Sequence, residues 1–312
     1  MMRAEHPLIV SASRTTDIPA FHMPWFMHRL REGWCVRVNP FNSGQRTRIE
    51  FDQARAVVFW SKDPRPLARH LPEVAERGLT FYIQYTLNDY AQEGLEPGLP
   101  SLAVRLDTFK RLADAWGPER LVWRYDPLLL GASLGVEELL DRLDRIGREI
   151  SPYTDTLTFS FLDLYAKCRA RLRTFDPFLR PPDTEEVLRL AQGLSAINQT
   201  WPGVLRLTTC AEAVDVSEYG IFPGACIDAA RLRYLCPDDV ALAELCGERP
   251  GFLPVQLRRD KGQRPLCNCL PSKDVGAYNT CRHFCRYCYA NHSEKTVFER
   301  LSRYDPASEA LV

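Results

Sequence analysis

The feature that most constrains the fold is a repeated alternation between short apolar runs and amphipathic helical segments. The apolar runs are rich in β-branched and aromatic residues and are nearly continuous, which is typical of strands buried on both faces. Helical spacing recurs between them, and Gly33, Gly78 and Gly117 follow three of the helical segments, as glycines at helix ends do. The apolar runs occupy residues 7–13, 54–62, 79–87, 120–127, 155–163 and 204–212.

Parallel strands joined by helical crossovers form either a βα barrel or an open doubly wound sheet. Segments 136–150 and 184–199 carry the helical spacing that such crossovers need. The chain has no G-x-G-x-x-G segment to support a nucleotide-binding version of the open sheet. We therefore predict an α/β fold, a complete or partial TIM-like βα barrel, with the open sheet as the alternative.

The chain is expected to form one barrel body with a cysteine-rich segment packed on it. Residues 1–262 carry the strand–helix pattern, 263–300 form the cysteine-rich segment, and 301–312 form a tail. Residues 34–51 depart from the alternation and predict a hairpin that turns at Asn42-Ser43-Gly44.

Polar or charged residues follow each of the six predicted strands. The carboxyl ends of barrel strands converge on one face, where active sites are built. Arg14 and Asp17 follow the first strand, while Arg124 and Asp126 end the fourth. We expect these four side chains to meet at the barrel mouth and to bind a small anionic molecule, because a guanidinium pairs well with carboxylate or phosphate. Alternatively, Asp17 caps a helix and Arg124 pairs internally with Asp126.

Charge and hydropathy exclude several classes of partner. The 312-residue chain has 40 basic and 40 acidic residues, so its net charge recruits neither nucleic acid nor an anionic membrane. No window approaches the roughly 18 to 20 apolar residues of a membrane span, and the N-terminus lacks a signal-peptide run. We expect a cytoplasmic protein with reduced thiols. Its 11 cysteines, an odd number, then indicate metal binding rather than a disulfide framework.

Three cysteines lie close together near the end of the chain. Cys281, Cys285 and Cys288 are spaced C-x3-C-x2-C, which lets a tight loop bring their thiolates to one metal centre. Thiolates select zinc, copper(I) or iron–sulfur clusters. The asymmetric spacing, unlike the paired C-x2-C of structural zinc sites, favours iron, and so does Tyr287, an aromatic that can pack against a cluster.

The segment CRHFCRYC resembles the C-x3-C-x-aromatic-C motif of radical S-adenosylmethionine enzymes. The resemblance implies a 4Fe–4S cluster on the three cysteines, with Tyr287 beside it and S-adenosylmethionine as a possible cofactor. More widely, SASRTTDIPAF, FWSKDP, WRYDP, CNC and CRHFCRYCYAN resemble an uncharacterised bacterial family described as having a radical-enzyme-like cysteine cluster at its C-terminus. In the radical enzymes the cysteine loop follows the first strand, whereas here it follows the last.

Barrel geometry accounts for this late position. The last strand of a barrel lies beside the first, so a loop after either strand overhangs the same mouth. The iron–sulfur cysteine loop is therefore expected over the barrel mouth, near Ser13, Arg14 and Asp17, with Ser13 and Tyr287 contacting the cofactor.

Four further cysteines leave three interpretations open. Cys267 and Cys269 form a C-x-C pair just upstream of the loop, while Cys210 ends a predicted strand and Cys226 follows it. They hold a second iron–sulfur cluster, or one of them is a fourth ligand to the first cluster, or all are buried inert thiols. The remaining four cysteines have apolar neighbours typical of core packing.

The sequence supports three functions. The first is a radical S-adenosylmethionine-like enzyme that acts on a small anionic substrate and receives electrons from a flavodoxin or ferredoxin. The second is an iron–sulfur redox protein without that cofactor. The third is a zinc-stabilised binding module, in which the metal only holds the C-terminal segment in place.

Overall fold

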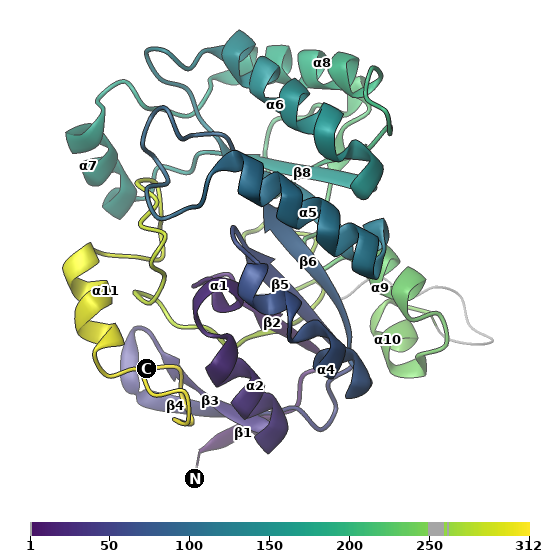
Figure 1. Ribbon diagram of the computed structural model, residues 1–312, viewed down its shortest axis with the longest axis vertical. Helices are drawn as coiled ribbons and strands as arrows, with labels where there is room; N and C mark the ends of the chain where they lie inside the picture. The colour runs from purple at the N-terminus through teal and green to yellow at the C-terminus, as the bar shows by residue number, and fades with distance from the viewer. Residues whose placement is uncertain (1, 249–258, 261) are drawn as a thin grey trace.

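The computed structural model describes residues 2–248, 259–260 and 262–312 (Figure 1). Its centre is an eight-stranded, wholly parallel sheet with the order β10-β9-β8-β7-β6-β5-β2-β11. The strands are β2 (Ile9–Ala12), β5 (Ala56–Ser61), β6 (Thr80–Thr86), β7 (Leu121–Leu128), β8 (Thr156–Phe161), β9 (Arg206–Thr209), β10 (Phe222–Pro223) and β11 (Lys273–Asp274).

The parallel sheet confirms the α/β class, and each of the six predicted strands is present. Closure into a complete barrel is not shown, because β10 and β11 lie at opposite ends of the sheet and no pairing joins them among the described residues.

Helices connect the strands and cover the sheet. Figure 1 shows α5, α6 and α8 side by side, and the predicted helical segments correspond to α6 and α8. The helices are α1 (Ile18–Phe21), α2 (Met23–Glu32), α3 (Arg65–Ala68), α4 (Leu71–Glu76), α5 (Leu102–Trp116), α6 (Val136–Ile150), α7 (Ala166–Phe175), α8 (Thr184–Asn198), α9 (Ala229–Leu235), α10 (Val240–Leu245) and α11 (Glu294–Leu301). No helix in the described ranges is both long and apolar enough to span a bilayer.

The two faces of the sheet bury different sets of residues, because successive side chains of a strand point to opposite faces. On β5, Val57 and Phe59 join the larger core with α2, α5, α6 and α8. Ala56 and Val58 face the other way and pack with α9, α10 and the chain around Leu270. We call this second side, which also carries Tyr82, the inner face of the sheet.

A separate three-stranded sheet holds β1 (Arg3–Glu5), β4 (Asn42–Glu50) and β3 (Trp34–Asn39) in that order. β3 and β4 form the predicted antiparallel hairpin. The turn begins two residues earlier than predicted: Asn39 pairs with Asn42, so Pro40 and Phe41 make the turn. Asn39 itself explains the shift, since its side-chain oxygen accepts a hydrogen bond from the Phe41 amide at 2.9 Å.

The end of the chain packs against its beginning. β11 pairs with β2, and the last residues lie on α2 and β3, where Trp25 donates to the Ser308 carbonyl at 3.0 Å and Ala310 bridges to Val36. The segment predicted as cysteine-rich therefore supplies a strand to the main sheet, and the predicted tail is packed rather than free.

Candidate functional site

The three-cysteine loop, residues 281–288, lies at the carboxyl ends of the parallel strands. It follows β11, which pairs with β2, so the last strand lies beside the first strand of the sheet as expected. His283 within the loop contacts Asp17, which follows β2, with 2.7 Å between Nε2 and Oδ2. Figure 1 shows this C-terminal chain, in yellow, passing beside α1. The loop therefore overhangs the sheet edge where βα folds place their active sites.

Asp274 fastens β11 to the turn after β2. Its carboxylate accepts hydrogen bonds from the Ser13 hydroxyl at 2.6 Å and the Arg14 amide at 2.7 Å, and further ones from Ser11 and Thr15. The Ser13 hydroxyl is thus engaged in holding the chain ends together. The peptide bond between Ala12 and Ser13 is cis, as is the bond between Asp126 and Pro127.

The loop is braced from outside by backbone contacts. Gly98 donates its amide to the His283 carbonyl at 3.0 Å, and Arg286 donates to the Leu95 carbonyl at 2.8 Å. A Cβ on Gly98 would lie 2.5 Å from the Arg282 carbonyl oxygen, so only glycine allows this approach. Arg171 of α7 donates to the Arg286 carbonyl at 2.7 Å and also binds the Cys288 carbonyl. Arg171 belongs to a basic run, residues 167–173, whose composition is typical of a solvated face, yet this side chain holds the loop.

The three thiols of the loop are close neighbours in a largely buried setting. Cys285 is buried, whereas Cys281 and Cys288 are partly exposed. Burial raises the pKa of the Cys285 thiol against the opposing effect of Lys62. Cys281 interacts electrostatically with both Cys288 and Cys285, but no sulfur–sulfur hydrogen bond joins the three within the described chain.

Across the described ranges, no group of three or more His, Cys, Asp or Glu side chains is arranged so that it could hold a metal ion. By residue type the loop still matches an iron–sulfur cluster, because it presents three thiols on one braced turn, and Lys62 acts electrostatically on Cys285. Cys281, Cys285 and Cys288 are therefore the residues that would hold such a cluster.

Tyr287 belongs to a buried polar network. Its hydroxyl contacts Glu96, lies 3.0 Å from Lys62 Nζ and accepts from Asn88 at 3.2 Å. Lys62 also pairs with Glu96 at 2.7 Å. Burial alone would raise the pKa of Glu96, but Lys62 holds it below its usual value. The network joins the loop to the ends of β5 and β6, so Tyr287 anchors the loop, while its packing against a cluster stays a prediction.

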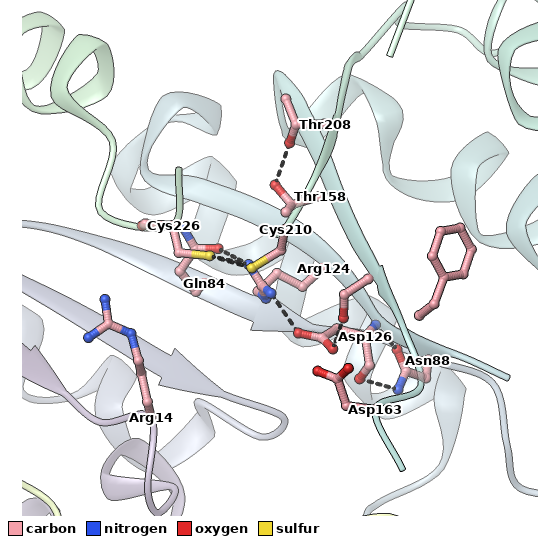
Figure 2. Close-up of polar contacts among 12 residues, drawn as sticks. Arg14, Gln84, Asn88, Arg124, Asp126, Thr158, Asp163, Thr208, Cys210 and Cys226 are labelled. Atoms are coloured by element: carbon pink, nitrogen blue, oxygen red, sulfur yellow. Dashed lines mark hydrogen bonds and ion pairs between the residues drawn. The ribbon is translucent and has the colours of Figure 1, made fainter. Parts of the chain in front are cut away.

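Arg124 and Asp126 form an ion pair on the inner face, with 2.5 Å between Nη2 and Oδ2 (Figure 2). Arg124 Nη1 also contacts Gln84 Oε1 at 3.3 Å and Cys226 Sγ at 3.0 Å. Burial opposes its charge, but Cys226 and Asp126 raise the pKa of Arg124 well above its usual value. Asp126 accepts a further hydrogen bond from Ser160 at 2.5 Å. Arg124 is therefore occupied by partners within the chain.

Arg14 approaches the same region from β2. Its guanidinium lies over the Trp60 ring at 5.0 Å, and the guanidinium of Arg124 lies over the same ring at 5.3 Å. Arg14 Nη1 reaches only a long contact to Ser272 at 3.5 Å, and its Nη2 is buried without a hydrogen-bond partner. Figure 2 shows Arg14 apart from the Arg124 pair, not bonded to it. Arg14 is thus the arginine with donor capacity left for a ligand.

Asp17 is not brought to the arginines. Its carboxylate caps α1 at the Ala20 amide at 2.9 Å and accepts from the Ser61 hydroxyl and the Lys62 amide at 2.8 Å each, besides contacting His283. Four partners on a side chain that is 6% exposed leave it no free lone pair directed at a ligand. Of the four residues expected to meet, the structure places Arg14 and Arg124 over Trp60, pairs Asp126 with Arg124, and places Asp17 at the loop.

The other four predicted ligands do come together. Cys210 and Cys226 lie 3.3 Å apart between sulfur atoms, and Cys269 Sγ accepts a hydrogen bond at 3.4 Å from the amide of Ile227, the residue after Cys226. Cys267 lies two residues before Cys269, and its interaction with Cys269 lowers the pKa of the Cys267 thiol to about 7. We call these residues the four-cysteine cluster. It packs on the inner face, and no hydrogen bond among the described residues joins its sulfurs to the three-cysteine loop.

Several residues of the site were not identified from the sequence. Asp274, Glu96 and Arg171 lie far along the chain from the residues they hold, and no local motif marks them. His283 stands inside the cysteine motif, but the motif does not indicate that it is buried against Asp17.

Comparison with protein families matches residues 9–290 to the model of a domain of unknown function, DUF1848. No curated protein and no solved structure gives a significant match.

Proposed function

Because the chain belongs to the DUF1848 family, whose description assigns no activity, we propose a function from the site itself. The protein is an iron–sulfur enzyme that acts on a small anionic substrate at the carboxyl ends of its parallel strands. The observation that carries the proposal is the placement of the three-cysteine loop: it follows the last strand of the sheet, yet it is held beside the end of the first strand by the 2.7 Å contact between His283 and Asp17.

Cys281, Cys285 and Cys288 would hold the cluster. A 4Fe–4S cluster on three thiolates leaves one iron without a protein ligand, and that iron would bind S-adenosylmethionine and deliver an electron to it, as in the enzymes that the motif resembles. The four-cysteine cluster contacts its own members, so the loop offers three thiolates and no fourth.

Arg14 is the residue we assign to substrate binding. Its buried Nη2 has no partner, and its guanidinium is held against Trp60, which fixes the direction of its donors. A planar guanidinium binds carboxylate or phosphate through paired hydrogen bonds that lysine does not reproduce. Asp126, with 31% of its side chain exposed, is available to accept a hydrogen bond from a hydroxyl or ammonium group of the same ligand.

Lys62 and the Glu96–Tyr287 network would hold the loop side of the pocket. Lys62 Nζ lies 3.0 Å from the Tyr287 hydroxyl of the loop, and both Cys285 and Asp126 contribute to its raised pKa. Burial alone would lower the pKa of Lys62, but Glu96 and Cys285 keep it above its usual value. A permanent positive charge here would balance thiolates and draw an anion toward the loop.

The proposal is tested with protein purified and reduced without oxygen, in the presence and absence of S-adenosylmethionine. We expect a cluster signal in electron paramagnetic resonance that shifts on addition of S-adenosylmethionine, and slow reductive cleavage of that cofactor. Cys285→Ser should lose both. Cys246→Ser, a substitution outside both cysteine groups, should lose neither. A cluster that ignores S-adenosylmethionine would make the protein an iron–sulfur redox protein, and zinc without sulfide in the loop would make it a zinc-stabilised module.

The substrate assignment is tested separately with inorganic phosphate as the probe. Phosphate should raise the melting temperature of the wild-type protein, because a ligand that binds only the folded state stabilises it. Arg14→Lys should abolish this shift while keeping iron and sulfide, whereas Arg31→Lys, at an exposed ion pair on α2, should not change it. An equal phosphate shift in all three proteins would remove Arg14 from the substrate site.

A further inference from the structure

The four-cysteine cluster lies where the two ends of the sheet face one another. Cys226 follows β10, the strand at one end, and Cys269 precedes β11, the strand at the other end. The two segments already touch: Leu270 donates its amide to the Ile227 carbonyl at 3.0 Å, and the Ile227 amide donates to Cys269 Sγ at 3.4 Å. The cluster therefore bridges the gap that leaves the sheet open.

Positive charge surrounds these thiols. Arg124 donates to Cys226 Sγ at 3.0 Å, and Arg264 lies 3.6 Å from Cys210 Sγ. Arg14 interacts electrostatically with Cys269. Buried guanidinium groups directed at sulfur stabilise thiolates, and they would offset the negative charge that four thiolates give to a bound divalent ion. Inert core thiols do not require such cations.

The spacing of the sulfurs distinguishes one ion from a multinuclear cluster. Four thiolates at about 2.3 Å from one tetrahedral zinc ion lie about 3.8 Å from each other. In an iron–sulfur cluster each cysteine binds a different iron, so the cysteine sulfurs stand farther apart. Cys210 and Cys226 are 3.3 Å apart, and Cys269 Sγ lies 3.4 Å from the amide of Ile227, the residue next to Cys226. This contact spacing fits a single ion better than the second iron–sulfur cluster expected from the sequence.

We propose that the four-cysteine cluster binds one tetrahedral zinc ion, which joins the two ends of the sheet and closes the barrel. The thiols do not surround a common point, so binding requires their side chains to reorient around the ion. A closed four-thiolate shell has no open position, so the ion is structural and takes no part in the chemistry of the three-cysteine loop. The proposal does not depend on the proposed function.

The first test is metal and sulfide analysis of the full chain, purified without oxygen from cells supplied with iron and zinc. We expect about one zinc per chain in the wild type. Cys267→Ser should lose this zinc and keep iron and sulfide, while Cys285→Ser should lose iron and keep zinc. Cys267→His should retain zinc, because an imidazole replaces a thiolate as a zinc ligand. Cys246→Ser is the matched control and should retain both metals.

A second measurement uses the wild type alone and so does not depend on a variant that folds. The four cysteines should resist alkylation by iodoacetamide until a zinc chelator is added, as read by mass spectrometry. Equal alkylation with and without chelator overturns the proposal. It is also overturned if Cys267→Ser keeps its zinc or loses iron and sulfide together. A Cys210–Cys226 disulfide in wild-type protein purified without oxygen would overturn it as well.

Discussion

Substitutions of Asp17, which contacts the cysteine loop, should destabilise the protein in proportion to the number of hydrogen bonds that are lost. Asp17 Oδ1 accepts from the Ala20 amide and the Ser61 hydroxyl, while Oδ2 accepts from the Lys62 amide and contacts His283. In Asp17→Asn one oxygen remains and one becomes an NH2 group. The new donor then faces the Lys62 amide, which as backbone cannot turn away, so the hydrogen bond from that amide is lost.

The expected magnitudes follow from the number of buried partners left unsatisfied. Each buried donor without an acceptor costs about 1–3 kcal/mol, although neighbouring losses are not additive. Asp17→Asn should therefore reduce the free energy of unfolding by about 2–3 kcal/mol. Asp17→Ala leaves all four donors without an acceptor, including the helix cap, and should cost about 4–5 kcal/mol.

Urea unfolding followed by tryptophan fluorescence measures these differences, and iron content of anaerobic protein reports on the loop. Asp63→Asn is the matched control: the same substitution after the next strand, where the partner Arg65 is half exposed, should cost at most about 1 kcal/mol. The reasoning is refuted if Asp17→Asn is as stable as the wild type, or if Asp17→Ala costs no more than the control.

Two further predictions concern close packing and pH. Gly98→Ala should displace the three-cysteine loop and lower its iron content at a cost of about 1–3 kcal/mol, because the added Cβ meets the Arg282 carbonyl at 2.5 Å; Gly135→Ala, with open space at the Cβ position, should leave iron content unchanged. Burial lowers the pKa of His22 from 6.5 to about 4. Between pH 6.5 and pH 4 the imidazole is therefore protonated in the unfolded chain and neutral in the folded chain. The free energy of unfolding should fall by about 3 kcal/mol as the pH drops from 6.5 to 4, as measured by urea titrations at each pH. His22→Gln should remove this part of the pH dependence, whereas His6→Gln, at an exposed position, should not.

The sequence predicted the framework because its signals are local. Continuous apolar runs marked every long strand of the sheet, and helical spacing gave α6 with the same limits that the structure has. β10 and β11 escaped notice because each has two residues, too few for a periodic pattern. The hairpin was recognised, but its turn depends on the single Asn39 side chain, which composition does not reveal.

The site was predicted in part for a similar reason. The ends of the strands can be located in the sequence, and this identified Arg14, Arg124 and Asp126. Their proximity follows because parallel strands end on the same side of the sheet. Whether such a residue is free or already paired depends on partners distant in the chain. Asp17 appeared to be a ligand-binding residue until His283, more than two hundred residues later, was seen to contact it. The four-cysteine cluster was predicted as a group, but only the sulfur contacts favour one ion over a cluster.

The central claim is that Cys281, Cys285 and Cys288 hold an iron–sulfur cluster. The most direct measurement is the iron and acid-labile sulfide content of protein purified without oxygen, compared with a variant in which all three are serine. The account predicts iron and sulfide in nearly equal amounts, about four of each per chain as a 4Fe–4S cluster contains, and their loss from the variant. Stoichiometric zinc in place of iron, without sulfide, in the oxygen-free wild-type loop would contradict it.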